Sequence, residues 1–170
     1  MSNQQQKFFG KYRGTVVNHV DPMRQGRVQV TVPNVLPLST WALPCVPFAG
    51  IQQGAFLVPM AGSGVWVEFE AGNQDRPIWV GGYWGSPGEV PALAQATAPG
   101  LQVVCINTLA QNTLLLSDMP GPTGGFLVKL TTGAFISVSD LGIVINNGKG
   151  AQISMVGPTV DVNLGALTVT

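Results

Sequence analysis

The C-terminal fold is decided by a repeated unit: Ile136-Ser-Val-Ser139, Ile143-Val-Ile-Asn146, Ile153-Ser-Met-Val156, Val160-Asp-Val-Asn163 and Leu167-Thr-Val-Thr170. Glycines punctuate these units at Gly133, Gly142, Gly150, Gly157 and Gly165. A spacing of about seven to ten residues is too short for a helical repeat or a propeller blade, and it predicts short strands stacked along an axis. Such strands cannot cover their own apolar faces or edges, so we expect the resulting rod to need partner chains.

The composition of the whole chain favours an all-β protein. The chain has 170 residues with 22 glycines and 13 prolines, which disfavours long helices and favours strands joined by tight turns. Only 9% of the residues are charged, against about 25% in a typical soluble domain. No run approaches the roughly eighteen apolar residues of a spanning helix, so we expect the apolar surface to be buried between subunits.

Charge and cysteine content limit the classes of partner. Lysine plus arginine and aspartate plus glutamate balance at eight each, so no positive field favours nucleic acid. Cys45 and Cys105 show no metal-ligand spacing, and we expect both to be buried free thiols. The N-terminus lacks the apolar core of a signal peptide, which predicts synthesis in the cytoplasm.

The pattern along the chain predicts four parts. Residues 1–9 form an N-terminal arm that ends in Phe8-Phe9, a pair expected to dock on its own domain or on a neighbour. Residues 10–84 form a small barrel closed by pairing of its first and last strands, and residues 85–100 form a linker with room for one helical turn. Residues 101–170, with five charged side chains, form the rod. The expected barrel strands are Tyr12–His19, Arg27–Val32, a short strand at Trp41–Leu43, Phe56–Pro59, Val65–Glu70 and Pro77–Val80.

A family resemblance covers about residues 10–170. The segment Pro59–Gly81, preceded by Gly14-Thr-Val-Val17 and Gly26-Arg-Val-Gln-Val30, resembles the OB-fold domain of phage baseplate assembly protein V and related central spike proteins. Proteins of this family join a small OB barrel to a triple-stranded β-helix. The resemblance implies a homotrimer whose three chains intertwine into one needle.

The resemblance also implies a structural function and a set of partners. The chain is expected to be the central spike of a contractile injection apparatus or phage-like tail baseplate, capping the inner tube through a separate hub protein. Sheath contraction would drive the needle through the target envelope, with transient membrane contact and possible effector cargo. The resemblance implies that the particle is a phage tail or an extracellular or cell-anchored injection particle.

Departures from other spikes carry information about the tip. The linker has no room for the lysozyme domain that some phage spikes insert. The only histidine is His19, so the rod offers no histidine pair to bind iron. The resemblance therefore implies a separate PAAR-like tip protein, for which Leu167, Val169 and Thr170 are the docking candidates.

No catalytic, cofactor or metal residues are expected, and we do not expect an enzyme. Glu68 and Glu70 lie two apart on one predicted strand and share a face, but solvated outer-face carboxylates are the favoured interpretation. His19 lies beside the Asp21-Pro22 turn, which favours a hydrogen-bonded surface histidine. The candidate contacts with other subunits or with the hub are Phe8, Phe9, Arg27, Trp66, Arg76, Trp79 and Trp84.

Two alternatives remain from the residues alone. Trp41, Trp66, Trp79 and Trp84 would suit an OB-fold binding module for single-stranded nucleic acid or glycan, although the basic groove that such a module needs is missing. A polysaccharide-degrading fibre would need an acidic cleft, for which Asp118, Asp140 and Asp161 are the only acidic residues in the rod.

Overall fold

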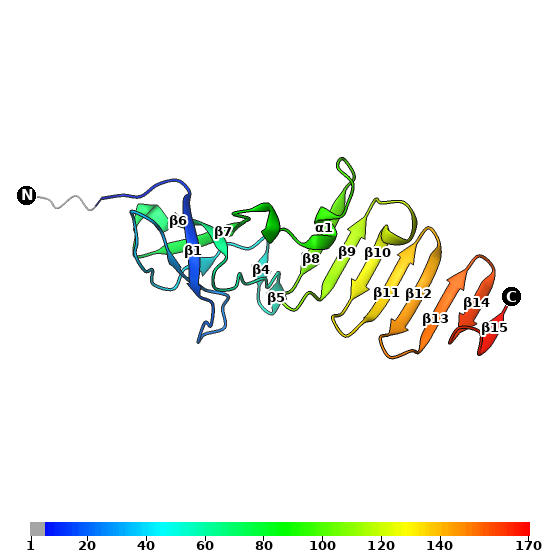
Figure 1. Cartoon of the computed structure of the whole chain (residues 1–170). Helices are drawn as coiled ribbons and strands as arrows, with labels where there is room; N and C mark the ends of the chain where they lie inside the picture. Colours follow the sequence, from blue (N-terminus) through cyan, green and yellow to red (C-terminus); the bar gives the residue numbers. More distant parts are fainter. Residues whose placement is uncertain (1–5) are drawn as a thin grey trace, which may run out of the picture. The chain divides into compact units, whose positions relative to one another are not determined.

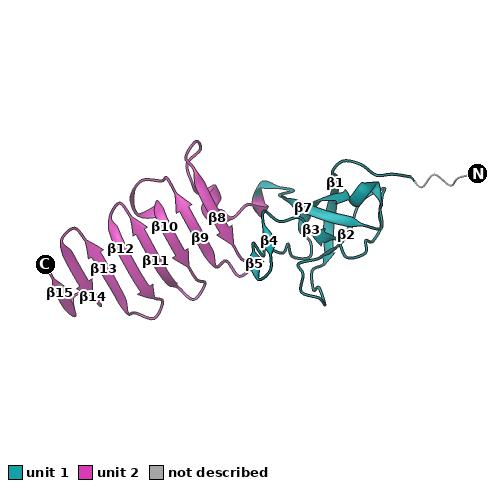
Figure 2. Ribbon diagram, turned by 180° about the vertical axis from the view of Figure 1, so that it is seen from behind, with its two compact units in different colours: residues 1–87 teal, residues 88–170 magenta. Residues whose placement is uncertain are grey.

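The computed structural model describes residues 6–170, which form two compact units, residues 6–87 and 88–170 (Figure 2). Nearly all regular structure is β, which confirms the all-β class. The boundary between the units lies within the stretch expected to be a linker. The part of the N-terminal arm formed by residues 1–5 lies outside the described residues.

The first unit is a small barrel. Its elements are β1 (Tyr12–Asn18), β2 (Gln29–Thr31), β3 (Leu43–Pro44), β4 (Ala49–Gly50), β5 (Gln53–Gly54), β6 (Gly64–Phe69), the 3-10 turn η1 (Glu70–Gly72) and β7 (Pro77–Tyr83). Five strands pair in the order β2-β1-β6-β7-β3, where β3 runs parallel to β7 and the other pairs are antiparallel.

The circuit closes between the second and third strands. Val28, next to β2, and Ala42, next to β3, exchange two backbone hydrogen bonds of 3.2 and 2.7 Å. Pairing of the first strand with the last was therefore the wrong expectation, because β1 already has β2 and β6 on its two edges. The bridge leaves no open sheet edge between β2 and β3 at that level.

The barrel core forms on the inward faces of the strands. Val65 and Val67 are fully buried and Phe69 nearly so, while Trp66 and Glu68 between them point outward, as the alternation predicts. The complete buried cluster is Val16, Val28, Val30, Val32, Ala42, Val65, Val67, Phe69 and Trp79.

One predicted barrel strand is wrong. Phe56–Pro59 has no strand partner, and Phe56 is 70% exposed. The strands in this region are instead β4 and β5, which form a hairpin with a two-residue loop at Ile51 and Gln52. An apolar run becomes a strand only where a neighbouring edge is available, and here that edge is absent.

The second unit is one antiparallel sheet of eight strands, ordered as they occur in the chain (Figure 1). A 3-10 turn η2 (Pro87–Glu89) begins at the unit boundary, and α1 (Ala92–Gln95) supplies the single helical turn expected there. The strands are β8 (Val103–Asn107), β9 (Thr113–Ser117), β10 (Gly125–Lys129), β11 (Ala134–Ser139), β12 (Gly142–Asn147), β13 (Gln152–Val156), β14 (Thr159–Val162) and β15 (Leu167–Val169), with η3 (Gly121–Thr123) before β10.

The five repeated units form the strands β11 to β15, except that Asn163 and Thr170 lie just beyond the ends of β14 and β15. Each strand pairs with its sequence neighbours in the same chain, so β8 and β15 are the outermost strands. Our expectation that all the edges would need partner chains is thus corrected, because hairpins satisfy the inner edges within one chain. What the single chain leaves uncovered is a face of the sheet.

Hydrogen bonds from side chains also join successive turns in the two rows of turns at the ends of the strands. Asn112 Oδ1 accepts the Thr131 N–H (3.2 Å), and Asn163 Oδ1 accepts the Gln152 N–H (3.0 Å). In the row of turns at the opposite strand ends, Asp140 Oδ2 accepts the Gly121 N–H at 3.0 Å. Because each bond links one turn to the next turn in the same row, the hairpins are fixed at their ends as well as along their strands.

Candidate trimer interface

The strand register places two apolar side chains from every strand of the second unit on one face. Residues that pair directly across antiparallel strands lie on the same face. One row is Val104, Leu116, Phe126, Val138, Ile143, Met155, Val160 and Val169. The other is Ile106, Leu114, Val128, Ile136, Ile145, Ile153, Val162 and Leu167. We call these two rows the apolar face.

The apolar face lacks cover within the chain. Val104 is 58% exposed, Leu116 51% and Ile145 42%, although all are large aliphatic residues. No charged or polar residue interrupts either row. A continuous uncovered apolar surface of this kind marks a protein interface.

The opposite face becomes polar toward the C-terminal end of the sheet. Its middle row runs from Cys105 and Leu115 through Leu127 to Ser137, Val144, Ser154 and Asp161. The apolar beginning of this row lies near α1, since Leu93 and Leu115 line one pocket, and Leu115 is 4% exposed. The sheet therefore has one face suited to burial and one suited to water.

The repeated units predicted from the sequence cover only the last five of the eight strands of the apolar face. Val104, Leu114 and Phe126 belong to the same rows, but the repeat begins at Ile136. Period-two alternation in Val103–Asn107 and Thr113–Ser117 is the signal that would have extended the prediction.

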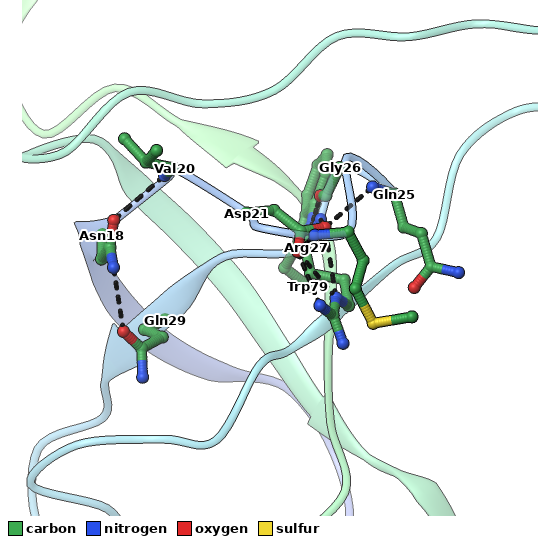
Figure 3. A network of polar contacts seen from close by, with 9 residues as sticks. Asn18, Val20, Asp21, Gln25, Gly26, Arg27, Gln29 and Trp79 are labelled. Atoms are coloured by element: carbon green, nitrogen blue, oxygen red, sulfur yellow. Dashed lines mark hydrogen bonds and ion pairs between the residues drawn. The ribbon is translucent and has the colours of Figure 1, made fainter.

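On the barrel, Asp21 and Arg27 form a nearly buried ion pair (Figure 3). Their side chains are 3% and 16% exposed, and Arg27 Nη2 lies 2.6 Å from Asp21 Oδ1. The carboxylate also accepts the N–H groups of Met23 and Gln25 (3.0 and 2.8 Å). The Arg27 guanidinium lies 5.5 Å from the Trp41 ring. Arg27 is thus committed to the β1–β2 connection, which differs from our expectation of an intersubunit or hub contact.

The hydrogen bond from Arg27 holds the pKa of Asp21 well below its usual value, with the backbone N–H groups acting in the same direction. Because the pKa is depressed in the folded state, Asp21 stabilises the barrel above the unfolded pKa of about 4. This stabilisation is lost as the pH falls from about 4 through the folded-state pKa.

Asp21→Asn is therefore expected to lower the melting temperature of the barrel at pH 7, with a difference from wild type that shrinks below pH 4. All four tryptophans lie in the first unit, so tryptophan fluorescence follows barrel melting selectively. Asp75→Asn is the control, because Asp75 is exposed. A wild-type advantage that stayed constant down to pH 2.5 would contradict the assigned ion pair.

Trp66 belongs to a cluster on the outside of the barrel. Arg13, directly opposite Trp66 on β1, places its guanidinium 5.5 Å from the Trp66 ring and 5.4 Å from that of Tyr83. The two rings have centroids 5.1 Å apart. Arg, Trp and Tyr are the residue types most enriched in interface hot spots. Tyr83 was not among our candidates, and its pairing with Gly64 across β6 could have been read only from the register.

The remaining barrel candidates divide into packed and exposed residues. Phe8 packs on its own barrel, with its ring centroid 6.0 Å from that of Phe69. Trp79 is 6% exposed and donates its Nε1–H to Gly26 O (3.0 Å), so it belongs to the core of its own barrel. Phe9 is 70% and Trp84 63% exposed.

Arg76 is also largely solvent-exposed, at 65% of its side chain, and pairs with Glu70 at 3.4 Å. The four tryptophans have different surroundings: Trp79 in the core, Trp41 beside Arg27, Trp66 beside Arg13 and Trp84 in solvent. They do not assemble into one stacking platform.

At the other end of the chain, Leu167 and Val169 lie opposite Val162 and Val160 and end the two rows of the apolar face. They are 59% and 57% exposed in the single chain. Thr170 follows the last strand and is exposed.

The residues weighed for chemistry have structural surroundings. Glu68 bonds Lys11 at 2.6 Å on the barrel surface, whereas Glu70 lies in η1 beyond the end of β6. His19 Nδ1 accepts the Ala61 N–H at 3.2 Å. Among residues 6–170, no three histidine, cysteine or acidic side chains cluster in a way that would hold a metal ion.

The two cysteines differ. Cys45 is exposed, which corrects our expectation of a buried thiol. Burial raises the pKa of the half-buried Cys105 thiol, which donates to Asn107 Oδ1 (3.2 Å).

Comparison with known families assigns both units. Residues 12–84 match the injector OB domain of type VI secretion systems and phage baseplates. Residues 103–168 match the C-terminal trimerisation domain of phage baseplate V proteins. The chain belongs to the phage baseplate V family. Together the two matches span both units, and no curated protein matches the chain.

Membership gives the apolar face its partner. The second unit is a trimerisation domain, so a baseplate V homotrimer supplies two further copies of the same face. The first unit is an OB barrel, and the chain is a structural component of a phage tail or secretion-system particle. Within the described part of the chain, no helix is long and apolar enough to cross a membrane.

Proposed function

We propose that this chain is the central spike of a contractile injection apparatus or phage-like tail. Three copies cap the inner tube through a hub protein and pierce the target envelope when the sheath contracts. The observation that carries the proposal is the apolar face, which runs without interruption over all eight strands of a trimerisation domain. Such a face builds a continuous dry core, as a needle that must transmit force requires.

The proposed hub contacts are on the barrel. The cluster of Arg13, Trp66 and Tyr83 offers rigid aromatic surface and a cation, while Phe9 and Trp84 offer exposed aromatic rings. Arg76 is a further candidate, because a surface pair such as Arg76–Glu70 contributes little and can be exchanged for a partner's carboxylate.

The proposed tip contact is at β15. This outermost strand pairs only with β14 among the described strands, so its other edge presents backbone donors and acceptors. A PAAR-like tip protein, with or without effector cargo, would add to this edge and cover Thr170. Leu167 and Val169 would then serve the trimer core and the rim of the docking platform together.

Transient membrane contact follows from the low charge of the needle. Residues 101–170 carry five charged side chains. Eight strands about 4.8 Å apart stack over about 34 Å, close to the roughly 30 Å of a hydrocarbon core. Because each charge that enters lipid costs several kcal/mol, a charge-poor needle lowers the barrier to passage.

Cryo-electron microscopy of the native particle tests the proposal. We expect three copies on the particle axis, with the barrels toward the tube and β15 pointing away from it. The control is a particle from cells that lack this chain, which should lose density at the same position. Copies located off the axis, or in a number other than three, would overturn the spike assignment.

A further inference from the structure

A second apolar surface lies in the first unit, outside the trimerisation domain. Residues 28–67 contain no charged side chain. Within that stretch Phe48, Ile51, Phe56 and Leu57 are 60%, 96%, 70% and 60% exposed. We call these four residues the hairpin patch, since in sequence they lie in and beside the β4–β5 hairpin, whose two strands are labelled in Figure 1.

A pocket of about 320 Å³ lies next to the hairpin patch. Its apolar lining includes Val46, Val58 and the core residue Trp79, and the hairpin itself provides one wall through Gln52 and Gln53. Ile51 occupies the hairpin tip and is not among the lining residues. Phe56 and Leu57 of the hairpin patch line the pocket as well, so the barrel carries an apolar knob, Ile51, beside an apolar hole.

A protruding apolar side chain next to an apolar pocket on one chain suits a cyclic trimer. In a ring of three, each contact joins two different surfaces of neighbouring copies. The trimerisation domain tethers three barrels, which raises their effective concentration to about the millimolar range. No charge within residues 28–67 opposes contact between copies.

We propose that the β4–β5 hairpin of each protomer inserts Ile51 into this pocket of the neighbouring protomer. The barrels then make a trimer contact of their own, separate from the apolar face. This inference rests on the trimer and extends beyond the piercing role, because it assigns a function to surface that the needle does not use. The hairpin is suited to insertion, since its two-residue loop has few conformations to lose.

Hydrogen exchange of the full-length chain tests the proposal. The wild-type trimer is compared with Ile145→Lys, a change in the apolar face that is expected to leave a monomer. We expect the amides of residues 48–57 to exchange at least about tenfold more slowly in the wild-type trimer than in the Ile145→Lys variant. The β6 peptide should exchange at the same rate in the two proteins. Equal exchange of residues 48–57 would overturn the proposal, since its cover would then be solvent or the chain's own second unit.

Photo-crosslinking keeps the proposal testable if Ile145→Lys yields no soluble monomer. A benzophenone amino acid at position 51 is expected to give covalent dimers and trimers on a denaturing gel, with crosslinks mapping to Val46 or Val58. The same probe at Val20, which is 71% exposed on the β1–β2 connection, is the matched control and should give none. Crosslinks confined to one chain would overturn the contact.

Measurement of the native mass separates the two levels of failure. A wild-type chain that is not a trimer would contradict the spike proposal as well. A trimer without exchange protection and without interchain crosslinks at position 51 would overturn the hairpin contact alone.

Discussion

Ile145→Lys is expected to abolish the trimer and give a chain of monomeric mass at micromolar concentration. Ile145 lies in the middle of the apolar face, directly opposite Ile136 and Ile153. Burying an unpaired ammonium group costs several kcal/mol, and the symmetry of a trimer repeats that cost three times. No acidic residue on the apolar face could pair with the lysine. Light scattering and sedimentation measure the result.

Ser154→Lys provides the matched control. Ser154 lies on β13, next to Ile153 in sequence, but it faces the other side of the sheet, opposite Val144 and Asp161. Its lysine remains in water, so the trimer should keep its mass. If both variants stayed trimeric, or both became monomeric, the assignment of the two faces would be wrong.

Gly142→Ala is expected to destabilise the second unit by about 2–6 kcal/mol per chain, the sum of backbone strain and overpacking. Gly142 begins β12 with a φ of +141°, and a Cβ at this position would overlap the carbonyl oxygen of Met155 on β13. The backbone carbonyl cannot move aside without breaking the β12–β13 pairing. Thermal unfolding followed by far-UV circular dichroism gives the stability.

Gly157→Ala separates strain from overlap. Gly157 also has a positive φ, of +56°, but a Cβ there would meet no atom within 4 Å. We expect a loss of only about 1–2 kcal/mol, the cost of the left-handed conformation alone. Equal losses in the two variants would show that the carbonyl overlap at Gly142 contributes nothing.

Residue alternation and turn residues predicted the features of the fold that depend on residues close together in the sequence. Alternation in Val65–Glu70 gave the inward face of β6, and the five repeated units all became strands because apolar alternation and glycine turns agree. The family motif around Pro59–Gly81 supplied the barrel, which periodicity alone leaves open.

Features that depend on distant partners were not predictable in the same way. Phe56–Pro59 has the composition of a strand, yet nothing in the sequence says that no edge awaits it. Arg27 was assigned to a contact because its partner Asp21 is recognisable only once the connection between them is folded. Trp79 is as plausible on a surface as in a core until the pairing of β7 places it inward.

The candidate interface was predicted in kind but not in extent. The low charge of residues 101–170 predicted contact with other copies, and the match to a trimerisation domain supports the homotrimer. The chain satisfies its inner strand edges by itself, which the short repeat did not reveal. Hairpin register depends on turn geometry at residues such as Gly125 and Gly142.

Pairing between sequence neighbours has a consequence for how the particle is made. The eight-stranded sheet has low contact order, so each chain is able to form this sheet quickly and without help from the other chains. Until the sheets of two further copies bind, the apolar face is exposed to any other unfolded or incomplete chain in the cell. Correct assembly of three chains therefore competes with aggregation, and the concentration of unassembled chains determines which process dominates.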